Sequence, residues 1–184
     1  MLKRIDATLT VSRGSFNRTK NFKPDHIFSS KHLDLNFFDE ITLLCIDKVI
    51  EENEYFHFLE EKANNCFLPI TASGRIKTLK DAKRLFNSGA DRVIVNSLLW
   101  EDKGDILEEI SNVYGSQSLV ASIDVVKVDN QLKSYDWINE SSRNSLIPKI
   151  LKNRPELFGE IKIQAVDRDG GVIGPNIMVI EEIN

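Results

Sequence analysis

Short runs of apolar, often β-branched residues alternate along the chain with longer stretches in which apolar residues recur at helical spacing. Six of these runs predict strands, at residues 4–11, 41–46, 67–72, 92–97, 118–126 and 160–166. Most are almost continuously apolar, which is typical of strands that are covered on both faces. The alternation therefore predicts an α/β protein whose parallel strands are joined by crossover helices.

Helices are expected between these strands, at residues 51–65, 78–89, 102–115 and 144–153. The second is the best defined, because Thr78 can cap its N-terminus and Gly89 can end it. The stretch 22–40 is expected to be mainly loop, since Pro24 and a pair of serines interrupt its pattern. Residues 128–143 are polar and predict a small hairpin or a lid.

The number of strands leaves two architectures open. We count six β–α units, and the sequence ends shortly after the sixth strand. A closed parallel barrel needs eight strands and usually about 250 residues. The pattern therefore fits either an incomplete (β/α)₈ barrel or an open, doubly wound sheet of six strands, and periodicity alone does not choose between them.

Composition narrows the class of protein. A length of 184 residues with 41% hydrophobic residues suits one domain spanning 1–184. The formal net charge of −4 gives no basic face for nucleic acid. Cys45 and Cys66 lie in apolar runs and are expected to be buried, reduced thiols. No apolar run is long enough to cross a membrane, and the first residues lack a signal-peptide core, so a cytoplasmic protein is expected.

Polar residues follow most of the predicted strands, and the carboxyl ends of parallel strands are where such sheets bind ligands. Two carboxylates from different strands at one mouth can serve as an acid/base pair. A single aspartate in such a place can equally cap the next helix. The residues at these ends are Asp47, Ser73, Gly74, Asn96, Ser97, Asp124, Asp167, Asp169, Gly170 and Gly171.

Several of these positions also suit a phosphate group. Gly74, Asn96 and Ser97 precede predicted helices, whose N-termini favour anions, and the DRDGG segment reads as a glycine-rich loop. Arg18 belongs to a small basic cluster that fits a phosphate ligand better than a polymer. The histidines lack metal-ligand spacing, so neither a metal nor a cofactor is expected.

Three segments carry a resemblance to a known family: PITASGRIKTLKDAKRLFNSGADRVIVNS, YGSQSLVASIDVVK and VDRDGGVIG. They resemble successive strands and loops of the cyclase subunit of imidazole glycerol phosphate synthase, and RIDATLTVSRGSFNRTKNF resembles its first strand and loop. The resemblance spans nearly the whole chain and is weakest at 23–40 and 128–155. It implies a (β/α)₈ barrel that binds a substrate with two phosphates, accepts ammonia from a glutaminase partner and takes part in histidine biosynthesis.

The resemblance also implies roles for individual residues. Asp124 matches the catalytic acid of strand five, and Thr10 stands where the family has a second catalytic aspartate. Three of the four charged residues around the family's ammonia entrance are matched by Arg4, Arg92 and Glu160, whereas Thr42 takes the fourth position. Substrate- and phosphate-binding positions are matched by Asp47, Gly74, Asn96, Ser97, Asp169, Gly170 and, in the first loop, Arg18.

These departures leave the activity open. Threonine cannot act as a carboxylate acid/base, and Arg18 is a poor proton donor because its pKa exceeds about 12. The glycine-rich phosphate loop of the family is reduced to Ser73-Gly74-Arg75, and strands seven and eight do not follow in the sequence. The expectation is a cyclase with impaired activity. The alternatives are a non-catalytic, ammonia-conducting subunit that serves a glutaminase and a sugar amidotransferase in surface-polysaccharide synthesis, as the segment NFKPDHIF suggests, or a truncated remnant.

Overall fold

The computed structural model describes residues 3–29, 37–48, 54–101, 103–171 and 179. Its centre is a sheet in which six strands run parallel in the order β1, β4, β5, β6, β7 and β10. These are Asp6–Ser12, Glu40–Cys45, Ile70–Ser73, Arg92–Val95, Leu119–Val128 and Glu160–Ala165. All six strands expected from the sequence are present, and their order in the sheet is their order in the chain.

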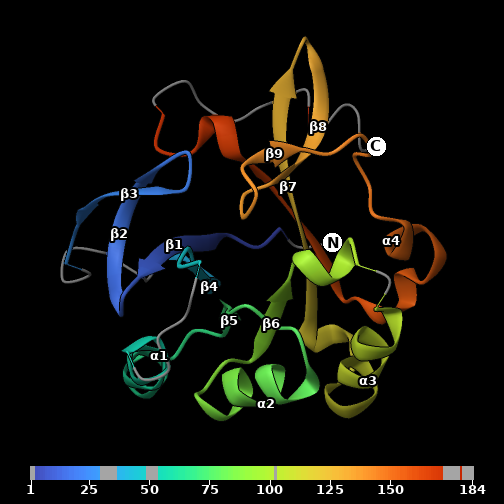
Figure 1. Ribbon diagram of the computed structural model, residues 1–184. Coiled ribbons are helices and arrows are strands. Elements are labelled where there is room, and N and C mark those ends of the chain that lie inside the picture. The colour runs from blue at the N-terminus through green and yellow to red at the C-terminus, as the bar shows by residue number, and fades with distance from the viewer. Residues whose placement is uncertain (1–2, 30–36, 49–53, 102, 172–178, 180–184) are drawn as a thin grey trace.

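Two antiparallel hairpins extend the sheet beyond the carboxyl ends of the parallel strands (Figure 1). The first consists of β2 (Ser15–Lys20) and β3 (Lys23–Ile27), and it turns at Asn21 and Phe22, which both have positive φ. The second consists of β8 (Gln131–Asp136) and β9 (Ser141–Ser142), which continue from β7. The hairpin expected within 128–143 is confirmed.

The expectation of a loop at 22–40 is wrong for its first part, because Lys23–Ile27 is a strand. Pro24 is accommodated there because β3 ends the strand order, so its missing N–H interrupts no second ladder. Residues 30–36 lie outside the described part of the chain. The helix expected at 144–153 is also shorter than predicted, since Pro148 precedes it and only Lys149–Asn153 is helical.

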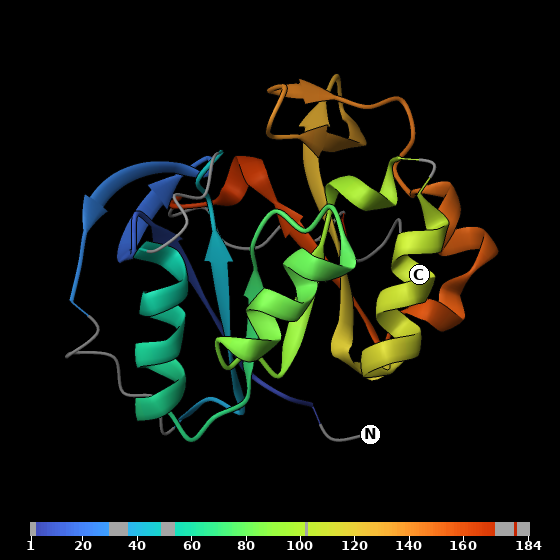
Figure 2. The ribbon, with the colours of Figure 1, turned by 60° about the horizontal axis from the view of Figure 1, so that its bottom comes forward.

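The helices α1 (Glu54–Asn65), α2 (Leu79–Asn87), α3 (Gly104–Tyr114) and α4 (Lys149–Asn153) lie along one side of the parallel sheet (Figures 1 and 2). The expected cap of α2 is confirmed, because the Thr78 hydroxyl accepts from the Asp81 backbone while the Asp81 carboxylate accepts from the Thr78 backbone. Such a capping box satisfies two backbone donors at once. It fixes the start of α2 directly after the turn that follows β5.

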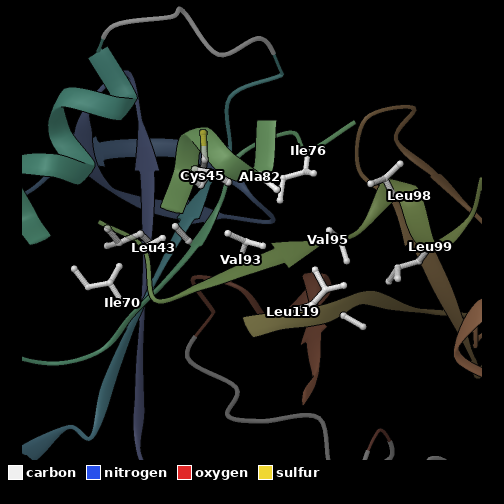
Figure 3. Packing of buried hydrophobic residues seen from close by; sticks show 14 of the residues in the cluster. Leu43, Cys45, Ile70, Ile76, Ala82, Val93, Val95, Leu98, Leu99 and Leu119 are labelled. Carbon is white, nitrogen blue, oxygen red and sulfur yellow. The ribbon is translucent and has the colours of Figure 1, made fainter. Parts of the chain in front are cut away.

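The hydrophobic core lies between the strands and these helices. Each strand sends alternate side chains toward the helices, and Figure 3 shows Leu43, Ile70, Val93, Val95 and Leu119 from four neighbouring strands meeting there. Burial at this interface provides most of the stabilisation of such a sheet, at about 25 cal/mol for each Å² of apolar surface. The opposite face of the sheet is therefore free to carry polar residues.

Polar side chains do line that opposite face, and they join its two end strands. Lys162 of β10 donates to Asp6 of β1 at 2.5 Å, and also to the Thr8 and Thr42 hydroxyls at 2.8 and 3.3 Å. Within the described residues β1 and β10 share no backbone ladder. The parallel α/β arrangement agrees with the sequence prediction, and side chains link the strands at its two ends.

Candidate functional site

A pocket lies at the carboxyl ends of β4, β5, β6 and β7, where the sequence predicted a site. Its volume is about 60 Å³. Asn96 and Asp124 contribute polar atoms from β6 and β7, and Trp137 of the β8–β9 hairpin closes one side. The remaining lining residues are Phe22, Leu44, Cys45, Ile46, Ser73, Gly74, Arg75, Ile76, Ile94, Val95, Ser97 and Ser122.

Asp124 is the titratable centre of this pocket. Its side chain is buried, and one carboxylate oxygen accepts from Asn96 Nδ2 at 3.0 Å. Burial raises the pKa of Asp124 to about 7, against the opposing influences of the Arg143 charge and the Asn96 hydrogen bond. A carboxyl group with a pKa near neutrality can both give and take a proton at physiological pH.

A second carboxylate, Asp136, stands at the edge of the same region but stays ionised. Burial opposes its ionisation, yet hydrogen bonds from Asn139 and the charge of Arg143 lower its pKa below the usual value. Arg143 donates to Asp136 at 2.7 Å and lies over the Trp100 ring. This ion pair fixes the base of the hairpin next to Asp124.

Three residues predicted to bind phosphate also surround this pocket. Asn96 and Ser97 lie where β6 gives way to the short 3₁₀ helix Ser97–Leu99, and Gly74 follows β5. A side chain at Gly74 would press against Leu85, because an added Cβ would lie 2.8 Å from a Leu85 methyl carbon. Gly74 therefore lets the turn pack closely on α2, and a side chain there would have to displace the Leu85 methyl group.

Four of the other predicted site residues lie in a separate groove. Thr10, Arg18, Asp169 and Gly170 line a hollow of about 430 Å³ between the first hairpin and the end of β10. The Thr10 hydroxyl donates to the Asn17 carbonyl. The sequence placed these residues and Asp124 around one ligand, whereas the structure distributes them over two neighbouring depressions.

Asp169 holds the first hairpin in place. Its carboxylate accepts from the Thr19 hydroxyl at 3.0 Å and from the Phe22 backbone N–H at 2.8 Å. The Phe22 side chain in turn lines the pocket that contains Asp124. Asp169 therefore acts on that pocket by positioning Phe22.

Asp47, like Asp169, accepts hydrogen bonds that hold neighbouring segments in place. Its carboxylate accepts from the Ser12 hydroxyl at 2.6 Å and the Arg13 backbone at 2.8 Å, which ties the ends of β1 and β4 together. Its backbone carbonyl accepts from Arg75 Nε at 2.8 Å and Arg75 Nη2 at 2.6 Å. Asp47 organises the rim of the pocket.

At the opposite ends of the strands, four charged side chains form a ring. Arg4 donates to Glu40 at 3.3 Å and to Glu160 at 3.1 Å. Arg92 donates to the same two carboxylates, with 2.6 Å to Glu160. The resemblance matches Thr42 to the family's fourth position, which leaves the expected set of charges incomplete. In the structure the fourth charge of this ring comes from Glu40, which begins β4 and accepts from both arginines.

Sequence reasoning missed Glu40, Arg75, Trp137 and Arg143. Glu40 precedes the apolar run of β4, so its inward direction was visible only as the period-two pattern that it shares with Thr42. Arg75 has a φ of 56°, which the sequence does not indicate. Trp137 and Arg143 belong to the β8–β9 hairpin, and no local sequence pattern predicts that this hairpin lies next to the pocket. Among the described residues no group of three or more His, Cys, Asp or Glu side chains is placed to hold a metal ion. None of the described helices is long and apolar enough to cross a membrane.

A parallel sheet covered by helices, with polar residues at its strand ends, defines an α/β protein, and comparison with known proteins specifies the family. The profile of the family described as histidine biosynthesis protein matches residues 6–184. A protein of Parasynechococcus marenigrum, provisionally named imidazole glycerol phosphate synthase subunit hisF2, is 37% identical over 180 residues, which are 91% of this chain and 66% of that protein. The imidazole glycerol phosphate synthase subunit HisF of Natranaerobius thermophilus is 31% identical over 195 residues, covering 100% of this chain and 75% of the relative.

The chain belongs to the HisF-like group of this histidine biosynthesis family. A third relative, the provisionally named hisF2 subunit of Campylobacter jejuni, is 34% identical over 143 residues. The chain spans 66% and 57% of the lengths of the Parasynechococcus and Campylobacter relatives.

Proposed function

We propose that the chain is a cyclase-type subunit that uses ammonia on a phosphorylated small molecule, as the names of its imidazole glycerol phosphate synthase relatives suggest. The observation that carries this proposal is Asp124, a buried carboxyl group with a pKa of about 7 in a pocket at the carboxyl ends of the strands. Asp124 is the acid/base group that gives a proton to, or takes one from, the ring that closes. Asn96 holds its carboxylate in one orientation.

Phosphate binding is assigned to the turns that follow β5 and β6. Gly74 allows a close approach of the backbone, and Asn96 and Ser97 offer donors at the start of a 3₁₀ helix. Such donors favour an anion. Arg18 and Gly170, which line the neighbouring groove, are proposed to hold the far end of a long substrate that extends from the pocket.

Ammonia is proposed to enter at the ring formed by Arg4, Glu40, Arg92 and Glu160, with a glutaminase subunit docked there. Two cations and two carboxylates that alternate around one opening favour a closed state, because each charge is satisfied by its neighbours. Opening the ring then requires a partner that supplies replacement contacts. Polar side chains on the strands between the ring and the pocket include Thr42, Thr71 and Ser122, which are all buried.

A second candidate function, favoured by Thr10, is a non-catalytic subunit that conducts ammonia to a sugar amidotransferase. Position 10 of β1 holds a threonine, whose hydroxyl donates to the Asn17 carbonyl, so no carboxylate is present at that position. A cyclase that uses a single carboxylate is expected to turn over slowly. This candidate predicts ammonia transfer to another enzyme without any cyclisation.

The test is cyclase turnover by the purified chain with an ammonium salt, so that no glutaminase is needed. Asp124→Asn is expected to lower turnover at least about 100-fold, the usual contribution of a positioned acid or base. Asp129→Asn is the matched control, since Asp129 is exposed in the turn between β7 and β8. Turnover that Asp124→Asn leaves unchanged would reject Asp124 as the acid/base, and no turnover from the folded chain would favour the conducting subunit.

A further inference from the structure

The pocket around Asp124 is too small for the ligand that its position suggests. Its volume of about 60 Å³ compares with the roughly 300–1,000 Å³ of ordinary small-molecule sites. A few water molecules fill such a space, whereas a phosphorylated metabolite does not fit. Arg75 and Trp137 both line the pocket, and the Arg75 guanidinium stacks on the Trp137 ring.

Arg75 is held over the pocket by three separate constraints. Its backbone has a φ of 56°, in the left-handed region that favours glycine. Its guanidinium donates twice to the Asp47 carbonyl, at 2.8 and 2.6 Å, and its central carbon lies 3.9 Å from the centroid of the Trp137 ring. Stacking an arginine on a tryptophan is attractive, and the partial burial of this arginine strengthens the contact.

Trp137 is fixed from the other side by the hairpin that carries it. The Asp136 carboxylate accepts from the backbone N–H groups of Ile138 and Asn139, each at 3.1 Å. Lys48, which follows β4, donates to the Ile138 carbonyl at 3.2 Å and to Glu140 at 3.0 Å. The stack therefore connects the β4–β5 side of the pocket to the hairpin of β7.

Among the described residues, Arg75 makes no ion pair within 4 Å, since both of its hydrogen bonds go to a backbone carbonyl. A neutral carbonyl is a weaker partner for a guanidinium than an anion. An incoming phosphate or carboxylate can therefore compete for Arg75 and draw it away from Trp137.

We propose that Arg75 is the specificity-determining residue of this pocket: stacked on Trp137, it excludes large ligands, and an anionic group admits its bearer by displacing the guanidinium. A neutral molecule of the same size stays outside. The proposal rests on the proposed function in taking this pocket as the ligand site. The test measures how readily a reagent reaches the pocket, and it does not depend on cyclase turnover.

Cys45 provides the readout, because it is buried and is one of the residues that line the pocket. In a Cys66→Ser background, the rate of Cys45 alkylation is measured with iodoacetamide and with a bulky maleimide. Arg75→Gly, which suits the φ of 56°, is expected to accelerate the maleimide reaction at least about tenfold and the iodoacetamide reaction much less. Burial raises the pKa of Cys45 to about 12, and the Arg75 charge opposes part of this shift, so loss of that charge alone would slow both reactions.

Two further variants separate pocket opening from other causes. Arg84→Ala is the matched control, because Arg84 also stacks on an aromatic ring, that of Phe56, away from the pocket. Arg75→Lys keeps the charge but loses the planar stack, and it is expected to open the pocket as Arg75→Gly does. Inorganic pyrophosphate should accelerate maleimide labelling of the Cys66→Ser protein that retains Arg75, and an uncharged glycol of similar size should not.

Maleimide rates that agree within about twofold between the Cys66→Ser protein and its Arg75→Gly variant would overturn the proposal. Equal acceleration with both reagents would also overturn it, since that result indicates general loosening and not removal of a size limit. A chain without cyclase turnover that still shows the Arg75-dependent size limit removes the proposed cyclase function and keeps this inference. A chain that shows cyclase turnover but no Arg75-dependent size limit keeps the proposed cyclase function and removes this inference.

Discussion

Lys162 and Asp6 face each other from the two end strands of the parallel sheet, with 2.5 Å between Nζ and the nearer carboxylate oxygen. Both side chains are largely buried, and the second oxygen of Asp6 has no partner among the described residues. The pair therefore joins β1 to β10 at a place where the two strands share no backbone ladder. An ion pair in such surroundings is costly to break from one side only.

Lys162→Met should lower the free energy of unfolding by about 3 kcal/mol, because it leaves the Asp6 carboxylate buried without its cation. Urea denaturation of the variant measures the change. Adding Asp6→Leu to Lys162→Met should recover most of the loss, since the pair is then replaced by apolar groups. Additive losses from the two substitutions would contradict a direct pair.

The ring of charges at the other ends of the strands predicts unequal effects for its two glutamates. Glu40 is 5% exposed and accepts from both arginines, so Glu40→Gln should cost about 3 kcal/mol in thermal or urea unfolding. Glu160 is 35% exposed, and Glu160→Gln should cost about 1 kcal/mol or less. Equal losses of unfolding free energy in the two variants would mean that Glu40 contributes no more to the ring than Glu160 does.

The pH dependence of stability should carry the signature of Asp124. Burial raises its pKa from 3.8 to about 7, so the folded chain binds more protons than the unfolded chain between these values. Stability from this group is therefore complete below about pH 4 and is lost as the pH rises toward 7, by up to about 4 kcal/mol. In Asp124→Asn this loss should be absent, which urea titrations at about pH 5 and pH 8 would reveal against Asp129→Asn as the control.

Gly170→Ala should loosen the first hairpin. Gly170 has a φ of 66°, and an added Cβ would overlap the backbone carbonyl of Thr19. We expect a loss of about 2 kcal/mol and faster proteolysis within residues 15–27. Gly104→Ala is the control, because Gly104 begins α3 and has no positive φ. Equal proteolysis of the two variants would contradict the close approach of Gly170 to the hairpin.

The six parallel strands could be predicted because each is an apolar run whose length and spacing leave little choice, as ITLLCI in β4 illustrates. Asp124 could also be predicted, since it follows such a run directly. The hairpin Ser15–Ile27 could not, because its strands alternate polar residues on an exposed edge and its turn depends on Asn21 and Phe22 with positive φ. Its position is set by a distant residue, Asp169, which no local pattern connects to it.

The same reason explains what was missed in the site. In the sequence, Arg75 is visible only as a residue of the reduced glycine-rich loop Ser73-Gly74-Arg75. Its contact with Trp137 joins residues that are far apart in the sequence. The resemblance directed attention to Thr42 and not to Glu40, and only the three-dimensional register brings Glu40 to Arg92. Contacts between residues distant in the sequence therefore determine where Arg75 and Glu40 lie in the site.

The strand β7 has a consequence for how the pocket can work. It is the longest strand among the described residues, and its ladder with β10 reaches Val125 while its ladder with β8 begins at that same residue, one step beyond Asp124. Asp124 and the hairpin that carries Trp137 are therefore coupled through β7, because β8 pairs with β7 from Val125 onward. A ligand that moves this hairpin must strain the β7–β8 ladder or shift Asp124 with it, so the position of the Asp124 carboxyl group reports the position of the hairpin.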